Sequence, residues 1–275
     1  MTRAVSDTLA LHSASHVTRL LTQMFEDDGR LVNGVTHVVA VATAGSKNLV
    51  LRTAERAFSS MHDEFVLGVA RARADAIITT GEILRSEPAL RLDVFGPGRM
   101  NEALADWRRS SIRKAGFPRT LLLTSGRDVS LEHPVFNGAN AVSILTGKTA
   151  PTRLVSEARE RGIHVLQVDE PGVRTAVDGL RDDYGLQAIS IEAGPSTATE
   201  LYRPPVMVNE IFLSQFHGPV SASSIVGAFL DTEVLLKTFV RRHPPHRVST
   251  DDGTWSFHHL VHQQVTTIPQ SEGGQ

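Results

Sequence analysis

Short apolar runs and helical apolar patterns alternate along most of this chain. β-branched and leucine-rich runs predict buried strands at residues 36–43, 76–80, 120–124, 141–146, 163–168, 189–192 and 208–214. Apolar residues at helical spacing predict helices between them, at residues 60–73, 100–115, 151–161 and 172–184. Regular alternation of strands and helices is typical of an α/β fold with a central, mainly parallel sheet and helices on both faces.

The two ends of the chain differ from this pattern. Apolar residues at helical spacing predict an amphipathic helix over residues 7–27, within an N-terminal helical extension, residues 1–34, that serves as an accessory element or a dimer contact. Trp255–Leu260 alternates as a final edge strand does. Residues 35–265 are the expected main domain, and the polar residues 266–275 are an expected disordered tail.

Composition narrows the classes of function. A formal net charge of −2 gives no field that attracts nucleic acid or an anionic membrane. The absence of cysteine excludes disulfides, thiol nucleophiles and cysteine-ligated metal. No apolar run approaches the ~20 residues of a membrane helix, and Met1–Asp7 lacks the apolar core of a signal peptide, so a cytoplasmic location is expected.

The stretch Ile189–Thr197 is the most informative local feature. Glu192 follows a buried strand, and the small residues Ala193 and Gly194 let a ligand or another backbone come close. Pro195 then suits the first turn of a helix. A strand, a small-residue turn and a helix start can hold an anion such as a pyrophosphate, although the same residues also fit an ordinary strand-to-helix turn.

Upstream, the run RARADA at residues 71–76 ends a predicted helix and leads into a strand, and the turn that follows holds Gly81 and an acid before proline, Glu87. With Ile189–Thr197 and the strand that begins Val208-Asn209-Glu210, these blocks resemble the reductase domain of bacterial riboflavin biosynthesis, a branch of the dihydrofolate reductase-like superfamily. The resemblance covers roughly residues 36–260 and implies a dihydrofolate reductase-like three-layer fold.

The resemblance also implies an activity. Its members are NADPH-dependent reductases that transfer a hydride to the ribosyl group of a (ribosylamino)pyrimidine phosphate, so the protein positions the acceptor and manages one proton. It implies a homodimer formed through Val208–Phe216 and Ile225–Leu236. Two alternatives stay open: a reductase of the same fold for another carbonyl or pterin-like substrate, and a non-catalytic nucleotide-binding homologue.

Site residues follow from the resemblance and from the strand ends. The expected ligands of the nicotinamide end and pyrophosphate are Thr80, Gly81, Ala193, Gly194, Pro195, Ser196 and Thr197. The adenosine 2′-phosphate is assigned to Ser125 and Arg127, with Thr146 sharing the adenosine role, although Arg127 equally fits a solvent-facing turn. The candidate catalytic acids are Glu192 and Glu87, and Glu192 also fits a structural role. The substrate phosphate is assigned to Lys47, Arg52 and Arg85.

Other polar residues are assigned structural roles or depart from the family. Asp63, at the opening of a helix, is expected to cap or pair, and the histidine spacing predicts no metal site. Glu82 stands where the family usually carries a second glycine and a threonine, which brings a negative charge near the expected cofactor phosphates. The sequence leaves open whether Glu82 blocks the cofactor or points to solvent. Without cysteine, the chain lacks the zinc deaminase domain often fused to this reductase.

Overall fold

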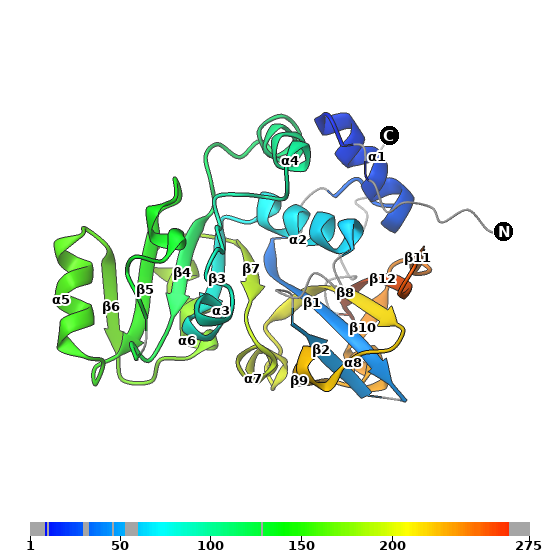
Figure 1. Cartoon of the computed structure of the whole chain (residues 1–275). Helices are drawn as coiled ribbons and strands as arrows, with labels where there is room; N and C mark the ends of the chain where they lie inside the picture. Colours follow the sequence, from blue (N-terminus) through cyan, green and yellow to red (C-terminus); the bar gives the residue numbers. More distant parts are fainter. Residues whose placement is uncertain are drawn as a thin grey trace, which may run out of the picture.

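The computed structural model describes residues 9, 11–29, 33–45, 47–52, 60–127 and 129–263. In this part of the chain, one twelve-stranded sheet carries helices on both faces (Figure 1). The strands are β1 (Gly34–Ala44), β2 (Lys47–Leu51), β3 (Ala76–Thr80), β4 (Arg119–Leu123), β5 (Val142–Gly147), β6 (His164–Val168), β7 (Ala188–Glu192), β8 (Val208–His217), β9 (Ile225–Phe229), β10 (Phe239–Arg241), β11 (His246–Thr250) and β12 (Gly253–His262). The helices are α1 (Ala14–Phe25), α2 (Met61–Arg73), α3 (Gly81–Ser86), α4 (Arg99–Ser110), α5 (Thr152–Glu160), α6 (Val173–Asp182), α7 (Pro195–Ala198) and α8 (Thr232–Thr238), with the short 3-10 helices η2 (Pro134–Asn137), η3 (Thr199–Tyr202) and η4 (Ala222–Ser224).

The centre of the sheet is parallel. Its strands follow the order β8-β1-β7-β3-β4-β5-β6, and each neighbouring pair in this series runs in the same direction. The strand β12 adds antiparallel pairing on the far side of β8, and β2 and β9 add it beside β1. The predicted fold class, a three-layer α/β fold with a mainly parallel sheet, is therefore confirmed. No described helix combines the length and the apolar character that crossing a membrane requires.

The end of the chain differs from the prediction. Trp255–Leu260 lies within β12, which pairs with β8 on one edge and with β10 and β11 on the other, so the predicted edge strand is wrong. The short outer strands were missed because β11 alternates only half-buried and exposed residues. The segment Val208–Phe216 is likewise enclosed, because β8 is paired on both edges, so it offers no edge to a second subunit. Of the other predicted dimer segment, Val226 and Val234 are exposed; the homodimer itself stays a prediction.

The helix α1 belongs to the main core. It is shorter than the predicted residues 7–27, and it ends at Phe25, before Glu26, whose backbone is left-handed at φ 50°. Its buried residues Val17, Leu21 and Phe25 join the same apolar cluster as Trp107 of α4 and sheet residues of β8 and β12. Residues 1–8 and 266–275 lie outside the described residues.

A buried charge network holds the amino ends of the central strands. The Glu210 carboxylate accepts hydrogen bonds from Arg73 at 2.7 Å and from the Thr36 hydroxyl at 2.8 Å, and His259 Nε2 lies 2.7 Å away. Burial acts to raise the pKa of Glu210, but the charges of Arg73 and His259 outweigh it, so that pKa is held well below the ordinary range. The acid that opens β8 is therefore a structural group, and it ties α2 to β1, β8 and β12.

The register of β1 shapes the other end of the sheet. Along one edge, β1 pairs with β7 from Gly34 to His37 and then with β2 from Val41 to Ala44. Its opposite edge pairs with β8 over the same length, so β2 lies in line with β7 and beyond its end. By the same reasoning β9, which pairs with β2, lies in line with β3. The carboxyl ends of β7 and β3 therefore face a second pair of strands, which encloses the space that follows them.

Candidate functional site

Three parallel strands end side by side below that second pair. Thr79 of β3 lies opposite Glu192 of β7, and Thr80 lies opposite Leu123 of β4. The turns that follow these strands are Ala193–Gly194, Gly81–Glu82 and Thr124–Gly126. Because ligands of parallel sheets bind outside the carboxyl ends of the strands, these three turns mark the candidate crevice.

The two predicted glycines of this crevice, Gly81 and Gly194, differ in why the position suits glycine. A Cβ on Gly81 would lie 2.7 Å from the Thr124 hydroxyl, so Gly81 is required by packing within the protein. Gly194 has φ −60° and ψ 161°, which any residue adopts, and a Cβ there would meet one atom within 4 Å, Glu82 Oε2 at 3.7 Å. The fold thus needs glycine at the first turn, whereas Gly194, although buried, has room beside its backbone for a small side chain.

The hydroxyl and proline residues near these turns are partly engaged already. The Thr80 hydroxyl caps α3, because it accepts a hydrogen bond from the Ile83 amide at 3.3 Å. The ring of Pro195 lies 3.1 Å from a Cβ placed on Gly227, so α7 packs against β9. Ser196 is exposed and Thr197 half-buried, which leaves both side chains within reach of a bound molecule.

The predicted acid Glu192 is held by an arginine that the sequence analysis did not select. Arg71 of α2 donates from Nε to one Glu192 oxygen at 2.7 Å and from Nη2 to the other at 2.6 Å. Both side chains are 10% exposed, so this bidentate pair is largely shielded from water. Glu192 therefore acts as a hydrogen-bond acceptor that fixes Arg71, and its assignment as a catalytic acid stays untested.

The second predicted acid, Glu87, acts on the same arginine. Burial lowers the pKa of Arg71, but the charges of Glu192 and Glu87 outweigh that effect, so its pKa is raised. Arg71 also lines a cavity of about 360 Å³ between α2 and the segment after α3. The cavity has an apolar floor that includes Leu67, Leu90 and Phe95. The structure thus brings the two predicted acids together at Arg71, beside a cavity that fits part of a small substrate.

Asp63 does not cap α2, which is one of the two structural roles, capping or pairing, expected for it. Ser60 caps α2, since its side chain accepts a hydrogen bond from the His62 amide. Burial raises the pKa of Asp63 to about 6; the Ser214 side chain opposes this shift and the Glu64 charge adds to it. Ser214, the neighbour of Asp63, is opposite Ala40 on β1, whereas β7 ends opposite Val38, two residues earlier on β1. Measured along β1, Asp63 therefore lies beyond the end of β7. An acid with a raised pKa thus lies near β8, which β1 separates from β7, and one turn before Leu67 on α2.

Of the residues predicted to bind the adenosine part of the cofactor, some are accessible and one is not. Ser125 and Arg127 are exposed in the turn after β4, where a phosphate can reach them. The Thr146 side chain is fully buried in β5, so it has no surface to offer to a cofactor. Thr146 was selected as a strand end, but β5 continues through Gly147, and the next cation, Lys148, pairs with Asp169.

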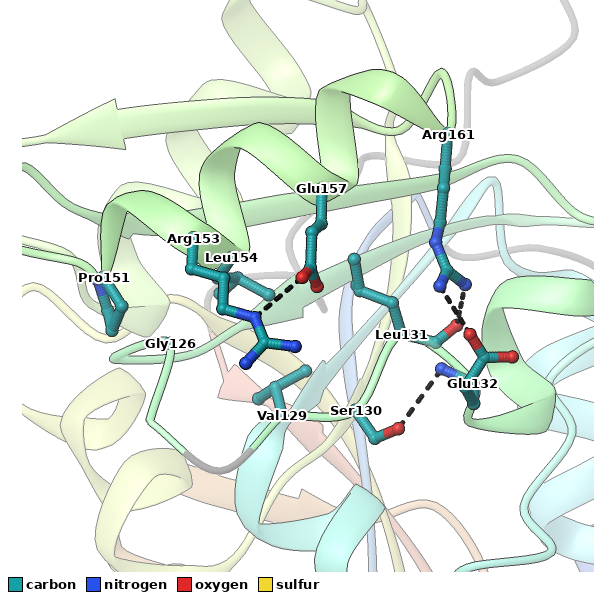
Figure 2. A pocket seen from close by; sticks show the side chains of 10 residues that line it. All are labelled: Gly126, Val129, Ser130, Leu131, Glu132, Pro151, Arg153, Leu154, Glu157 and Arg161. Atoms are coloured by element: carbon teal, nitrogen blue, oxygen red, sulfur yellow. Dashed lines mark hydrogen bonds and ion pairs between the residues drawn. The ribbon is translucent and has the colours of Figure 1, made fainter.

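A larger cavity, of about 460 Å³, lies between that turn and α5 (Figure 2). Figure 2 shows that its two arginines already have acidic partners: Arg153 pairs with Glu157 at 2.7 Å, and Arg161 pairs with Glu132. Because both arginine charges are compensated, this cavity attracts an anion less strongly than two unpaired arginines would.

The predicted phosphate cations are dispersed. Lys47 is exposed near the tip of the β1–β2 hairpin, opposite Ala44. Ala44 is six residues past Val38, or roughly 20 Å along the strand, so Lys47 lies far from the crevice. Arg52 follows the end of β2, and its amide donates to the Ser224 carbonyl, so it returns to the level of the β7 turn. Arg85 is exposed on α3. Arg52 is the member of this set that the topology brings nearest to Gly194.

Comparison with known proteins supports the fold. No family model matches the sequence, and no curated protein matches it. RibD of Acinetobacter baumannii superposes with a TM-score of 0.58 at 15% identity, over 86% of this chain and 59% of that protein. A pyrimidine reductase-like protein from Corynebacterium diphtheriae superposes with a TM-score of 0.59 at 17% identity, over 91% of this chain and all of that protein.

This chain has the fold of these two proteins. A further structure with it is the diaminohydroxyphosphoribosylaminopyrimidine deaminase/5-amino-6-(5-phosphoribosylamino)uracil reductase of Thermotoga maritima, with a TM-score of 0.51 at 12% identity, over 90% of this chain and 59% of that one. The chain thus spans about three fifths of the length of the Acinetobacter and Thermotoga proteins. The functional hypothesis below starts from the crevice at the ends of β7, β3 and β4.

Proposed function

We propose that this chain is an NADPH-dependent reductase that transfers a hydride to the ribosyl group of a (ribosylamino)pyrimidine phosphate. The observation that carries the proposal is the unfilled space beside the Gly194 backbone, at adjacent parallel strand ends, next to the cavity that Arg71 lines. The Acinetobacter and Thermotoga proteins, which are named RibD and a uracil reductase, support it through their shared fold.

The residues around the crevice fit a dinucleotide and a phosphate-bearing substrate. Gly194, Ser196 and Thr197 would hold the cofactor, with Ser125 and Arg127 at its adenosine end. When bound, the cofactor supplies the hydride. Arg71, fixed by Glu192, lines the cavity beside it and would donate a hydrogen bond from its guanidinium to the substrate.

Reduction of an open-chain ribosylimine also consumes one proton. Hydride adds to the sugar carbon of the C=N bond, and the nitrogen takes a proton and becomes the amine. We assign the proton to Asp63, whose raised pKa of about 6 lets it carry a proton closer to neutral pH than an ordinary aspartate. Glu192 is less suited to this step, because both of its oxygens accept hydrogen bonds from Arg71.

The direct test measures NADPH oxidation with a panel of substrates. Consumption of NADPH with 5-amino-6-(5-phosphoribosylamino)uracil, and no reaction with dihydropterins or simple aldehydes, would support the proposal. Turnover of a dihydropterin or another carbonyl alone would redirect it to a different substrate. No binding of NADPH in a calorimetric titration would exclude the reductase activity altogether.

Replacing Gly194 by valine is expected to weaken NADPH binding at least tenfold, which corresponds to about 1.4 kcal/mol. The valine side chain would occupy the space beside the backbone of residue 194, where the cofactor is proposed to lie. The fold should tolerate the change, because the nearest atom to the new Cβ, at 3.7 Å, is the end of a flexible glutamate. Calorimetric titration and a thermal melt measure the two effects separately. Unchanged NADPH affinity in a folded Gly194→Val variant would place the cofactor elsewhere.

The preference for NADPH or NADH tests the residues assigned to the adenosine 2′-phosphate. If Ser125 and Arg127 bind the 2′-phosphate, NADPH should bind more tightly than NADH, and Arg127→Ala should narrow the difference because a charge-assisted contact is lost. Arg109→Ala, which changes an exposed arginine on α4, is the matched control. Equal affinity of the parent protein for the two cofactors would refute this assignment.

A further inference from the structure

The carboxylate of the exposed Glu82 borders the space beside the Gly194 backbone. Glu82 Oε2 is 3.7 Å from the position of a Gly194 Cβ, and no other described atom beyond the chain neighbours of Gly194 comes within 4 Å of that position. The two residues belong to adjacent strand ends, since β3 and β7 pair up to Thr79 and Glu192. Glu82 therefore faces the crevice, which answers a question that the sequence leaves open.

Nothing in the described part of the chain neutralises this carboxylate. No hydrogen bond or ion pair involving the Glu82 side chain occurs among the described residues, and the exposed Arg85, three residues later on α3, does not pair with it. This differs from Glu192 at the neighbouring strand end, whose charge is compensated by Arg71. A ligand that rests on Gly194 thus meets an uncompensated negative charge.

We propose that Glu82 is a specificity-determining residue of this crevice: it disfavours a ligand that places phosphate on the Gly194 turn and favours one that presents hydrogen-bond donors there. The proposal rests on the proposed function, because it concerns the same crevice. A carboxylate accepts hydrogen bonds from hydroxyl, amide and ammonium groups, whereas two like charges a few ångströms apart repel. A dinucleotide that places its diphosphate on this turn is then expected to bind less tightly than it would without the carboxylate.

The test compares the parent protein with Glu82→Gln, which keeps the size of the side chain and removes its charge. Inorganic pyrophosphate and NADPH are titrated calorimetrically at low and high salt, and reduced nicotinamide riboside serves as a ligand without phosphate. Glu102→Gln is the matched control, because Glu102 is also an exposed acid in the first turn of a helix, α4, away from the crevice. A thermal melt of each variant reports any loss of folded protein.

The expected result is that Glu82→Gln binds pyrophosphate and NADPH about tenfold or more tightly than the parent. That gain should shrink at high salt, because salt screens an exposed charge. Binding of the riboside should not improve, and Glu102→Gln should behave as the parent does. Glu82→Thr, which also removes the charge, should share the gain.

The outcomes separate this proposal from the proposed function. The role of Glu82 would be overturned if Glu82→Gln bound NADPH and pyrophosphate no more tightly than the parent does. Tight NADPH binding by both proteins would leave the reductase proposal standing. A gain in pyrophosphate binding without NADPH binding in either protein would support the role of Glu82 and reject NADPH as the cofactor. Binding of neither ligand by either protein would overturn both.

Discussion

Replacing Asp63 by asparagine is expected to slow the reduction by about 10²- to 10⁴-fold, the usual contribution of a positioned general acid. The amide keeps the shape of the carboxyl group but cannot supply its proton. In the parent, the rate should fall as the pH rises through the Asp63 pKa of about 6, because the donor loses its proton. Steady-state rates between pH 5 and 8 measure both effects, once a substrate has been identified.

The same substitution should make the fold more stable near neutral pH. The unfolded chain releases the Asp63 proton near the ordinary pKa of 3.8, but the folded protein holds it up to a pKa of about 6. Stability of the parent therefore falls as the pH rises between these values, and stays lower above them. An asparagine at this position carries no such penalty, so Asp63→Asn should gain up to about 3 kcal/mol above pH 6 and little below pH 4.

Urea unfolding of both proteins at pH 4 and pH 7.5 measures that gain. Asp106→Asn, at an exposed position on α4, is the control and should change stability by less than about 0.5 kcal/mol. A variant that loses stability but keeps full activity would show that Asp63 is a structural group, and the proton would then have to come from another acid or from water.

The largest loss of stability is expected from the network at the opposite end of the sheet. Glu210→Gln leaves the Arg73 guanidinium, 6% exposed, without its counter-charge, and removal of one partner from a buried pair costs about 3–5 kcal/mol. Because the folded pKa of Glu210 is lowered, its contribution is present above the ordinary range of a glutamate and is lost as the pH falls below it. The difference between variant and parent should thus be largest near neutral pH.

The control for this measurement is Glu157→Gln, which removes one partner of the exposed Arg153–Glu157 pair on α5. Exposed pairs contribute about 0.5 kcal/mol or less within a helix, so this variant should unfold nearly as the parent does. Similar urea midpoints for all three proteins would mean that the buried network adds no net stability, as happens when the cost of desolvation equals the attraction.

The parallel half of the fold could be predicted from the sequence because each of its strands is a short apolar run between helical patterns. The strands β2 and β9 could not, since each holds five residues with mixed burial and takes its place from pairing with distant partners. Such pairing depends on the register of β1, which no local pattern encodes.

The candidate site shows the same division. The Gly194 turn was predicted because small residues after a buried strand have a local meaning. The role of Arg71 was not, because a charged residue in the last turn of a helix ordinarily faces solvent, and its partner Glu192 is 121 positions away in the sequence. Asp63 was assigned a helix-opening role from its position alone, whereas its raised pKa arises from burial that only the packing of α2 creates.

The position of β1 has a consequence for the order in which the chain can fold during synthesis. Its two parallel partners, β7 and β8, begin at Ala188 and Val208, so both edges of β1 lack those partners until most of the chain has left the ribosome. Of the pairings of β1, the β1–β2 hairpin is the one that can form early. Unpaired apolar strands of this kind are prone to aggregate, and non-local pairing is slow to form. Slow translation would therefore prolong the interval in which β1 is exposed, and the yield of soluble protein depends on how that strand is protected until β7 arrives.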